Sequence, residues 1–292
     1  MSRPQTLTDY GLRVQRAIAH MAANLDRDLD LETLAGVACF SPFHFHRVFR
    51  EITGRTTAEV LRRLRLNRAA GELIQGAAPL PGIARRSGYG SVAAFTRAFR
   101  ALYGVPPATY RRQGRLVPAT DPEPHPREDM MYETSFIDFP GARVAGIDHV
   151  GPFTEMGAAF DRLFAWARAR GLDTPEARSY GIYPDDPESV PAAQLRSVAC
   201  LTVGPDVVAE GPVRLLDIAA GPCVRIVHQG PYAELEAAYT WLYRDWLPRS
   251  GREPDDRPCF EEYLNDPHQL PPGEWLTAIH MPLKPAAAPV AA

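Results

Sequence analysis

The chain has 292 residues, of which 45% are apolar and 23% are charged, and its formal net charge is −3. These values are typical of a globular protein, and no apolar run reaches the roughly 18–20 residues that a membrane-spanning helix needs. The first residues also lack the apolar segment of a secretory signal. We therefore expect a cytoplasmic protein with no membrane partner.

The near-neutral total hides a division of charge along the chain. Residues 1–118 contain 18 basic and 8 acidic side chains, whereas residues 119–292 contain 14 basic and 27 acidic ones. A basic part of this kind is typical of binding to a polyanion such as nucleic acid. The acidic part is then expected to oppose nonspecific contact between the basic part and DNA.

Proline content places the domain boundary near the point where the charge changes sign. Four prolines and no helical or strand periodicity between Gln113 and Met131 predict an extended linker. The Pro/Ala-rich end is predicted to be disordered. The predicted organisation is a basic domain over 1–112, a linker over 113–131, an acidic domain over 132–284 and a tail over 285–292.

The basic part has helical periodicity throughout and contains an internal repeat. Ser41–Gly54 and Ser91–Gly104 share the pattern S-x3-F-x-R-x-F-R-x3-G at an offset of 50 residues. A short helical segment precedes each copy, over 32–38 and 81–87. A tight turn, over 39–40 and 88–90, separates this segment from the copy. A short helix, a turn and a longer helix form a helix-turn-helix motif, with each serine as the predicted N-cap.

Each longer helix has one apolar and one polar face. In the first copy, the predicted core face contains Phe45, Val48, Phe49 and Ile52. The opposite faces are the candidate DNA-contacting surfaces: Phe43, His46, Arg47 and Arg50 in the first copy, and Ala93, Thr96, Arg97 and Arg100 in the second. Such faces are also found simply solvated, but two copies in a strongly basic domain favour DNA binding.

A helix predicted from Thr57 to about Gln75 joins the two motifs. At 1.5 Å per residue it spans about 28 Å. We expect this spacing to place the two reading helices in successive major-groove segments on one side of a duplex.

Residues 8–112 resemble the AraC/XylS family of bacterial transcription regulators. The resemblance includes Gly88-Tyr89-Gly90-Ser91 and Gly104-Val105-Pro106-Pro107 in the second motif. It implies a seven-helix unit whose third and sixth helices contact bases. The positions it aligns with DNA contacts are Phe43, His46 and Arg47 in the first helix and Ala93, Ala94, Thr96 and Arg97 in the second.

The acidic part has strand-like alternation interrupted by two helices, over about 154–170 and 234–248. The predicted strands are 133–139, 142–150, 196–203, 213–218, 223–228, 259–263 and 276–281. A second repeat, His149-Val-Gly-Pro-Phe and His228-Gln-Gly-Pro-Tyr, precedes the two helices at an offset of 79. The pattern predicts an α+β domain of two pseudo-symmetric strand–helix–strand modules.

The two repeated histidines are not predicted to bind metal, because no carboxylate or cysteine lies at ligand spacing. The His-x-Gly-Pro segments are interpreted as strand-to-helix turns in which glycine supplies an unusual backbone angle. No cofactor is indicated.

A candidate ligand site lies at Glu261 and Tyr263, which share one face of a predicted strand, while Glu262 is expected to face water. A carboxylate among aromatic rings can hold a cationic or hydroxyl-bearing molecule. Six further aromatic residues are candidates for this site, although most such residues simply pack in a core: Phe153, Tyr180, Tyr183, Tyr232, Trp241 and Trp275.

Residues 131–284 look like the GyrI-like small-molecule-binding domain, through the two His-x-Gly-Pro motifs and Phe260-Glu261-x-Tyr263. The resemblance implies two modules that enclose an effector groove, with Glu261 as the ligand carboxylate. The whole sequence is interpreted as a non-enzymatic transcription regulator with double-stranded DNA, a small effector and RNA polymerase as partners. Two alternatives remain open, a small-molecule hydrolase with Glu261 as general base and a binding scaffold with a vestigial pocket.

Overall fold

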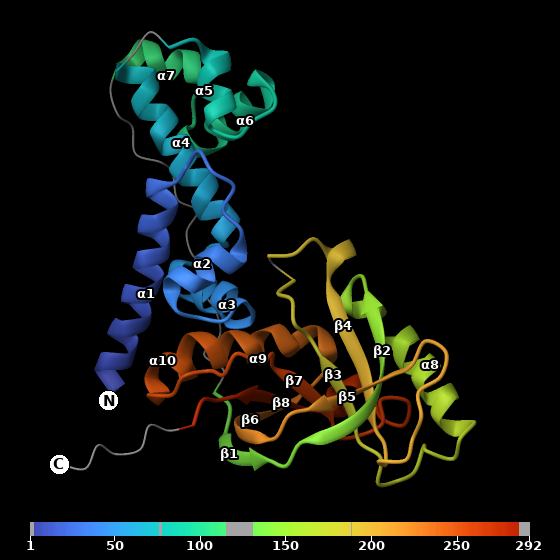
Figure 1. The fold of residues 1–292 in the computed structure, drawn as a ribbon. Coiled ribbons are helices and arrows are strands. Elements are labelled where there is room, and N and C mark those ends of the chain that lie inside the picture. The colour runs from blue at the N-terminus through green and yellow to red at the C-terminus, as the bar shows by residue number, and fades with distance from the viewer. Residues whose placement is uncertain (1–2, 76–77, 115–130, 188, 286–292) are drawn as a thin grey trace, which may run out of the picture.

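The computed structural model describes residues 3–75, 78–114, 131–187 and 189–285, and Figure 1 shows a helical part joined to a part built on one sheet. Within 3–114 the described chain forms seven helices, as the resemblance implies. They are α1 (Arg3–Ala23), α2 (Leu31–Ala38), α3 (Pro42–Thr53), α4 (Thr57–Gln75), α5 (Leu80–Arg86), α6 (Val92–Tyr103) and α7 (Pro107–Gln113). The predicted linker lies almost wholly outside the described residues.

Local sequence explains where α3 and α6 begin and end. Ser91 is the N-cap of α6, and its hydroxyl accepts a hydrogen bond from the Ala94 amide at 3.2 Å. Ser41 occupies the same position before α3 but makes no such bond. Both helices end at a glycine in the left-handed region, Gly54 at φ 69° and Gly104 at φ 75°, which residues with a β-carbon rarely adopt.

The apolar faces of the two helices pack as predicted, with one exception. Phe45, Val48 and Phe49 are buried on α3, but Ile52 at the end of this stripe is 41% exposed. The expectation that Ile52 packs in the core is therefore wrong, because α3 ends one residue later, at Thr53, and this side of its last turn stays exposed among the described residues. On α6, Phe95 and Phe99 lie in a separate core formed by α4, α5, α6 and α7.

The second part contains one antiparallel eight-stranded sheet with the order β1-β6-β8-β7-β3-β4-β2-β5. Seven of its strands are the predicted ones. The sequence pattern missed β3, which has only four residues and contains Gly181, a poor strand former. The strands are β1 (Thr134–Phe139), β2 (Ala142–Val150), β3 (Ser179–Ile182), β4 (Arg196–Thr202), β5 (Arg214–Ile218), β6 (Gly221–Gln229), β7 (Phe260–Tyr263) and β8 (Leu276–Pro282).

Two helical segments cover the sheet. The first is the 3₁₀ turn η1 (Phe153–Glu155) followed by α8 (Gly157–Arg168). The second is longer and consists of η3 (Tyr232–Glu234), α9 (Leu235–Trp241), the π-helical segment η4 (Leu242–Trp246) and α10 (Leu247–Ser250). Pro248, near the start of α10, has no N–H with which to continue the α-helical pattern. Two further 3₁₀ turns are η2 (Ala192–Gln194) and η5 (Pro272–Glu274).

The sheet and helices form two pseudo-symmetric modules, β2-α8-β3-β4 and β6-α9-β7-β8. His149 pairs with Ser197 in the first module as His228 pairs with Thr277 in the second. Each His-x-Gly-Pro segment turns the chain from a strand into a 3₁₀ turn, with Gly151 at φ 141° and Gly230 at φ 147°. These values lie in the region that favours glycine, which agrees with the expected role of the motif.

The two parts share one hydrophobic core on one side of the helical part. Residues of α1 and α3, including Tyr10 and Phe49, belong to the same buried cluster as Leu242 and Tyr243. The Tyr10 hydroxyl also donates a hydrogen bond to the Arg252 carbonyl at 2.8 Å. In Figure 1, α3 lies against α9, whereas α6 lies at the far end of α4. No described helix is long and apolar enough to cross a membrane.

Candidate nucleic-acid interface and ligand cage

The predicted outer face of α6 is open to solvent. Ala93, Arg97 and Arg100 are exposed, and Ala94 and Thr96 are half-buried. Among the described residues, neither Arg97 nor Arg100 makes a hydrogen bond or an ion pair. The predicted DNA-contacting face of α6 therefore presents two exposed guanidinium groups.

The corresponding face of α3 is covered by the second part of the chain. His46 is 3% exposed, and Phe43, Arg47 and Arg50 are half-buried. The expectation that the polar face of α3 is an outer surface is therefore wrong for this structure. The reason is tertiary, since residues far along the chain supply the partners of this face.

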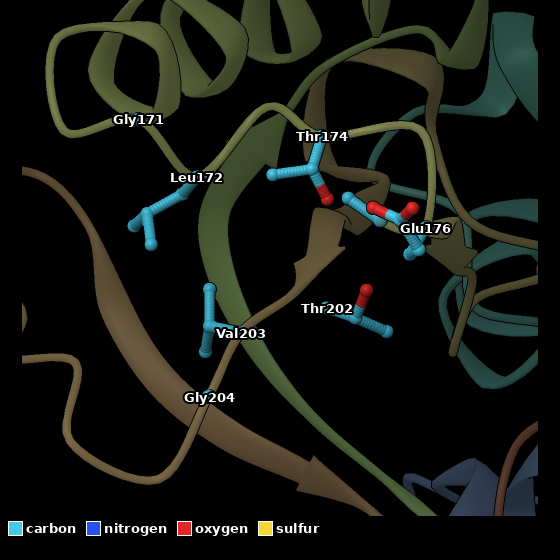
Figure 2. A pocket seen from close by; sticks show the side chains of 8 residues that line it. Gly171, Leu172, Thr174, Glu176, Thr202, Val203 and Gly204 are labelled. Atoms are coloured by element: carbon cyan, nitrogen blue, oxygen red, sulfur yellow. The ribbon is translucent and has the colours of Figure 1, made fainter.

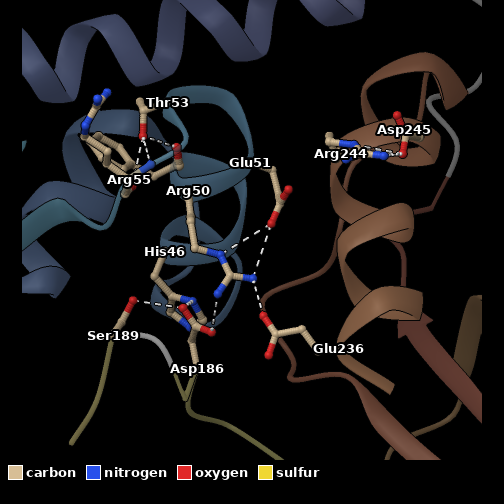
Figure 3. Close-up of polar contacts among 11 residues, drawn as sticks. His46, Arg50, Glu51, Thr53, Arg55, Asp186, Ser189, Glu236, Arg244 and Asp245 are labelled. Carbon is tan, nitrogen blue, oxygen red and sulfur yellow. Dashed lines mark hydrogen bonds and ion pairs between the residues drawn. The ribbon is translucent and has the colours of Figure 1, made fainter. Parts of the chain in front are cut away.

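Acidic side chains meet the histidine and the last arginine of this face (Figure 3). His46 Nδ1 lies 3.2 Å from Asp186 Oδ2, and an Arg50 nitrogen lies 3.7 Å from Asp186 Oδ1. Arg50 also donates to Glu236 Oε1 of α9 at 2.9 Å. Burial opposes ionisation of Asp186, but the contact with His46 and the charges of Arg47 and Arg50 outweigh it and lower its pKa.

Aromatic rings of the second helical segment hold the middle of the same face. The Arg47 guanidinium carbon lies 4.1 Å from the ring centroid of Tyr239 and 5.6 Å from that of Tyr243, which is cation–π geometry. His44, on the same helix, lies 2.7 Å from the Tyr243 hydroxyl through Nδ1 and 3.1 Å from the Arg257 carbonyl through Nε2. Since a carbonyl only accepts, Nε2 carries the proton and Nδ1 accepts from tyrosine.

Glu261 is the buried carboxylate of the candidate ligand site, and it is 5% exposed. Tyr239 donates a hydrogen bond to its Oε1 and Tyr263 to its Oε2, each at 3.1 Å. Burial raises the pKa of Glu261 to about 7, while the two hydrogen bonds and the charge of Arg47 hold it below the value that burial alone would produce. Glu261 is thus poised to change charge near neutral pH.

Aromatic rings from both modules surround this carboxylate and form what we call the aromatic cage. At its centre, the hydroxyls of Tyr183 and Tyr263 lie 2.6 Å apart. Phe153 packs edge-on against Tyr183 with 4.9 Å between ring centroids, and Tyr232 packs likewise against Tyr263 at 5.4 Å. Trp275 lies 4.6 Å from Tyr232. Tyr232 is 37% exposed, so this ring of the cage is in contact with solvent.

The two modules contribute to the cage unequally at one pair of positions. Gly181 lies directly across from Glu261 in the β3–β7 pairing. A β-carbon at Gly181 would lie 2.6 Å from both a ring carbon of Tyr183 and the hydroxyl of Tyr263. The glycine therefore makes the space in which the two tyrosine rings meet, and only one module carries a carboxylate there.

Two predicted site residues, Tyr180 and Trp241, lie outside the cage, and the expected exposure of Glu262 is wrong. Tyr180 lies on the opposite face of the sheet, where it packs near Phe139 and Phe260. Trp241 packs against Tyr132, with 5.5 Å between ring centroids. Glu262 does not face water. It is 9% exposed and lies 3.3 Å from Arg178, because the curled sheet encloses the face that a flat sheet would leave open.

Sequence reasoning missed two members of the cage, Tyr239 and Phe160. Phe160 of α8 packs edge-on against Tyr263 at 5.4 Å between ring centroids. The two missed residues are separated by 79 positions, the offset of the His-x-Gly-Pro repeat. Extending that repeat into the helices would have identified both.

A separate pocket of about 350 Å³ lies beside the loop that follows α8. Figure 2 shows the side chains that line it. Leu172, Ala177, Thr202 and Val203 line it together with exposed loop residues, and none of its lining residues is buried. It contains no member of the aromatic cage. The described residues contain no group of three side chains able to hold a metal ion.

Comparison with known proteins divides the chain at the same place as the charge. Residues 34–113 match a helix-turn-helix domain, and residues 132–284 match a GyrI-like small molecule binding domain. The chain is 35% identical over 102 residues to an uncharacterized HTH-type transcriptional regulator of Bacillus subtilis. This match covers 35% of each protein, so the chain spans about a third of that regulator's length.

A second relative matches the other half. The chain is 32% identical over 150 residues to the DNA gyrase inhibitor of Erwinia billingiae, which covers 50% of this chain and 93% of the inhibitor. Among solved structures, the EcmrR C-terminal domain is 21% identical, with a TM-score of 0.44, and the match covers 53% of this chain and 99% of that domain.

Proposed function

Because the chain belongs over residues 132–284 to the family of GyrI-like small-molecule-binding domains, we propose that it is a transcription regulator controlled by a small organic molecule. Its helical part binds double-stranded DNA, and the aromatic cage binds a cationic or aromatic effector at Glu261. The helix-turn-helix match over residues 34–113 supports the first role. RNA polymerase is the further partner included in this proposal.

The observation that carries the effector site is a buried carboxylate inside a cage of aromatic rings. An organic cation entering such a cage gains a charge interaction with Glu261 and cation–π contacts with Tyr232, Tyr263 and Trp275. The low polarity of the site strengthens both. A neutral molecule of the same shape gains only apolar contact.

The observation that supports DNA binding is the open arginine face of α6. Arg97 and Arg100 lie on successive turns of the helix, with small residues before them. Arginine can bind guanine through two hydrogen bonds, and an alanine allows close approach of the helix to a base edge. The net positive charge of residues 1–118 supplies the contact with phosphates.

The effector site is tested by calorimetric titration of the full chain at pH 8 with benzyltrimethylammonium and with its uncharged isostere neopentylbenzene. We expect the cation to bind and Glu261→Gln to weaken it about tenfold or more. The matched control is Glu262→Gln, which changes the same charge on the same strand but on the opposite face of the sheet. It should leave the affinity unchanged.

Equal affinity for the cation and its isostere, or equal loss in the two variants, would contradict the role of Glu261. Failure of both probes to bind would reject the cationic class and leave the scaffold interpretation. Turnover of an ester probe that disappears in Glu261→Gln would instead favour hydrolysis. Both oxygens of Glu261 are engaged by tyrosine hydroxyls, which supports a binding role over that of a general base.

A further inference from the structure

The two predicted DNA-contacting helices, α3 and α6, differ in the exposure of their polar faces. The arginines of α6 are free of partners among the described residues, whereas the polar face of α3 is packed against the sheet-containing part. The covering surface consists of Asp186, Glu236, Tyr239 and Tyr243, and we call it the α3 dock.

The α3 dock offers the chemical groups that a DNA groove would offer. Asp186 and Glu236 supply negative charge to Arg50, as phosphates would, and Asp186 also lies against the ring of His46. The Tyr239 ring supplies a flat π-surface to the Arg47 guanidinium, where a base edge would otherwise receive it. Because the same side chains cannot contact both partners at once, the dock and DNA exclude each other on α3.

The packing of the dock is specific rather than a loose surface contact. Asp186 is 2% exposed, and it also accepts a hydrogen bond from the Ser189 hydroxyl at 2.9 Å (Figure 3). Arg50 forms ion pairs with both Asp186, which lies in a loop, and Glu236 of α9. Two separate elements of the second part therefore contact the same helix. Buried charged groups of this kind require their partners, which favours a defined docked state.

We propose that the α3 dock competes with DNA for α3. While α3 is docked, the protein contacts DNA through α6 alone; when α3 is released, both helices contact DNA. The inference rests on the proposed DNA-binding function. The acidic part was expected to oppose DNA contact through its overall charge, whereas here the opposition comes from a contact between the α3 dock and α3. It also predicts that weakening the dock strengthens DNA binding, although the substitutions lie outside the reading helices.

The test uses the full chain and a duplex that the full chain selects from a random-sequence pool. We expect Asp186→Asn/Glu236→Gln to bind this duplex about tenfold more tightly, within the range usual for coupled sites. Hydroxyl-radical footprinting should show protection in one major-groove segment for the wild type and in two for the variant. The matched control, Asp161→Asn/Asp206→Asn, removes the same charge from exposed sites of the same part and should keep the wild-type footprint.

A second variant keeps the test decisive if loss of the buried Asp186 impairs folding. Glu236 is about half exposed, so Glu236→Arg can fold while it repels Arg50. It should extend the footprint, whereas Asp161→Arg, with the same change of charge, should not. An unchanged footprint in the dock variants, with an affinity gain no larger than in the controls, would overturn the inference. If no variant binds any duplex, the proposed DNA-binding function itself fails.

Discussion

Replacing Glu261 by glutamine should stabilise the protein at alkaline pH and change little at acidic pH. Burial raises the pKa of Glu261 to about 7 from an ordinary value of 4.5. The hydrogen bonds from Tyr239 and Tyr263 and the charge of Arg47 act in the opposite direction but do not cancel burial. Between these two pH values the folded protein retains a proton that the unfolded chain has lost.

The pKa difference fixes both the sign and the size of the effect. Because the folded pKa is the higher one, the stabilisation is fully present below pH 4.5 and is lost as pH rises through 7. At about 1.4 kcal/mol per pH unit, this interval corresponds to a loss of about 3 kcal/mol. Glutamine does not ionise, and its amide oxygen can still accept a hydrogen bond from tyrosine. Glu261→Gln should therefore match the wild type near pH 4.5 and exceed it by about 3 kcal/mol at pH 8.5.

Urea unfolding of the full chain at unit steps from pH 4.5 to 8.5 measures this difference directly. Glu262→Gln removes the same charge from the other face of the strand and separates the burial of Glu261 from the general effect of lost charge. A difference between Glu261→Gln and the wild type that stays constant with pH, or falls as pH rises, would refute the reasoning. The expected gain in stability would be accompanied by weaker effector binding, since residues that serve binding often lower the stability of the folded protein.

The remaining expectations concern the cage and the reading helices. In calorimetry, the affinity for benzyltrimethylammonium should fall about tenfold per pH unit below pH 6, because a cation binds ionised Glu261; a flat profile would contradict this. Gly181→Ala should cost roughly 1–3 kcal/mol in thermal unfolding, because its β-carbon would overlap Tyr263, and an unchanged midpoint would reject that clash. In gel-shift titrations, Arg97→Ala should cost about 1–3 kcal/mol on the selected duplex, and equal loss on random DNA would reject base reading. Saturating benzyltrimethylammonium should widen the wild-type footprint, because a cation beside Glu261 repels Arg47; an unchanged footprint would separate the cage from the α3 dock.

Local patterns in the sequence predicted most of the elements. The repeated serine, phenylalanine and glycine positions predicted α3 and α6 and their ends, because capping and left-handed glycine are properties of a few neighbouring residues. The His-x-Gly-Pro repeat predicted the two modules for the same reason. The strand β3 was missed because four residues with a central glycine carry too little pattern.

The candidate site was predicted in part. Alternation along one strand placed Glu261 and Tyr263 on the same face, which is a local property. The position of Tyr180 on the opposite face and the burial of Glu262 were decided by the pairing of β3 with β7 and by the curl of the sheet. Tyr239 joined the site because α9 packs across that sheet.

The sequence alone determined that α3 and α6 each have an apolar and a polar face, since side-chain periodicity fixes this within one helix. Only the tertiary structure decided what each polar face meets. The charge of an arginine can be met by water, by phosphate or by an acidic protein surface, so the same repeated pattern is open on α6 and docked on α3. The choice depends on Asp186 and Glu236, which lie more than 130 residues away along the chain.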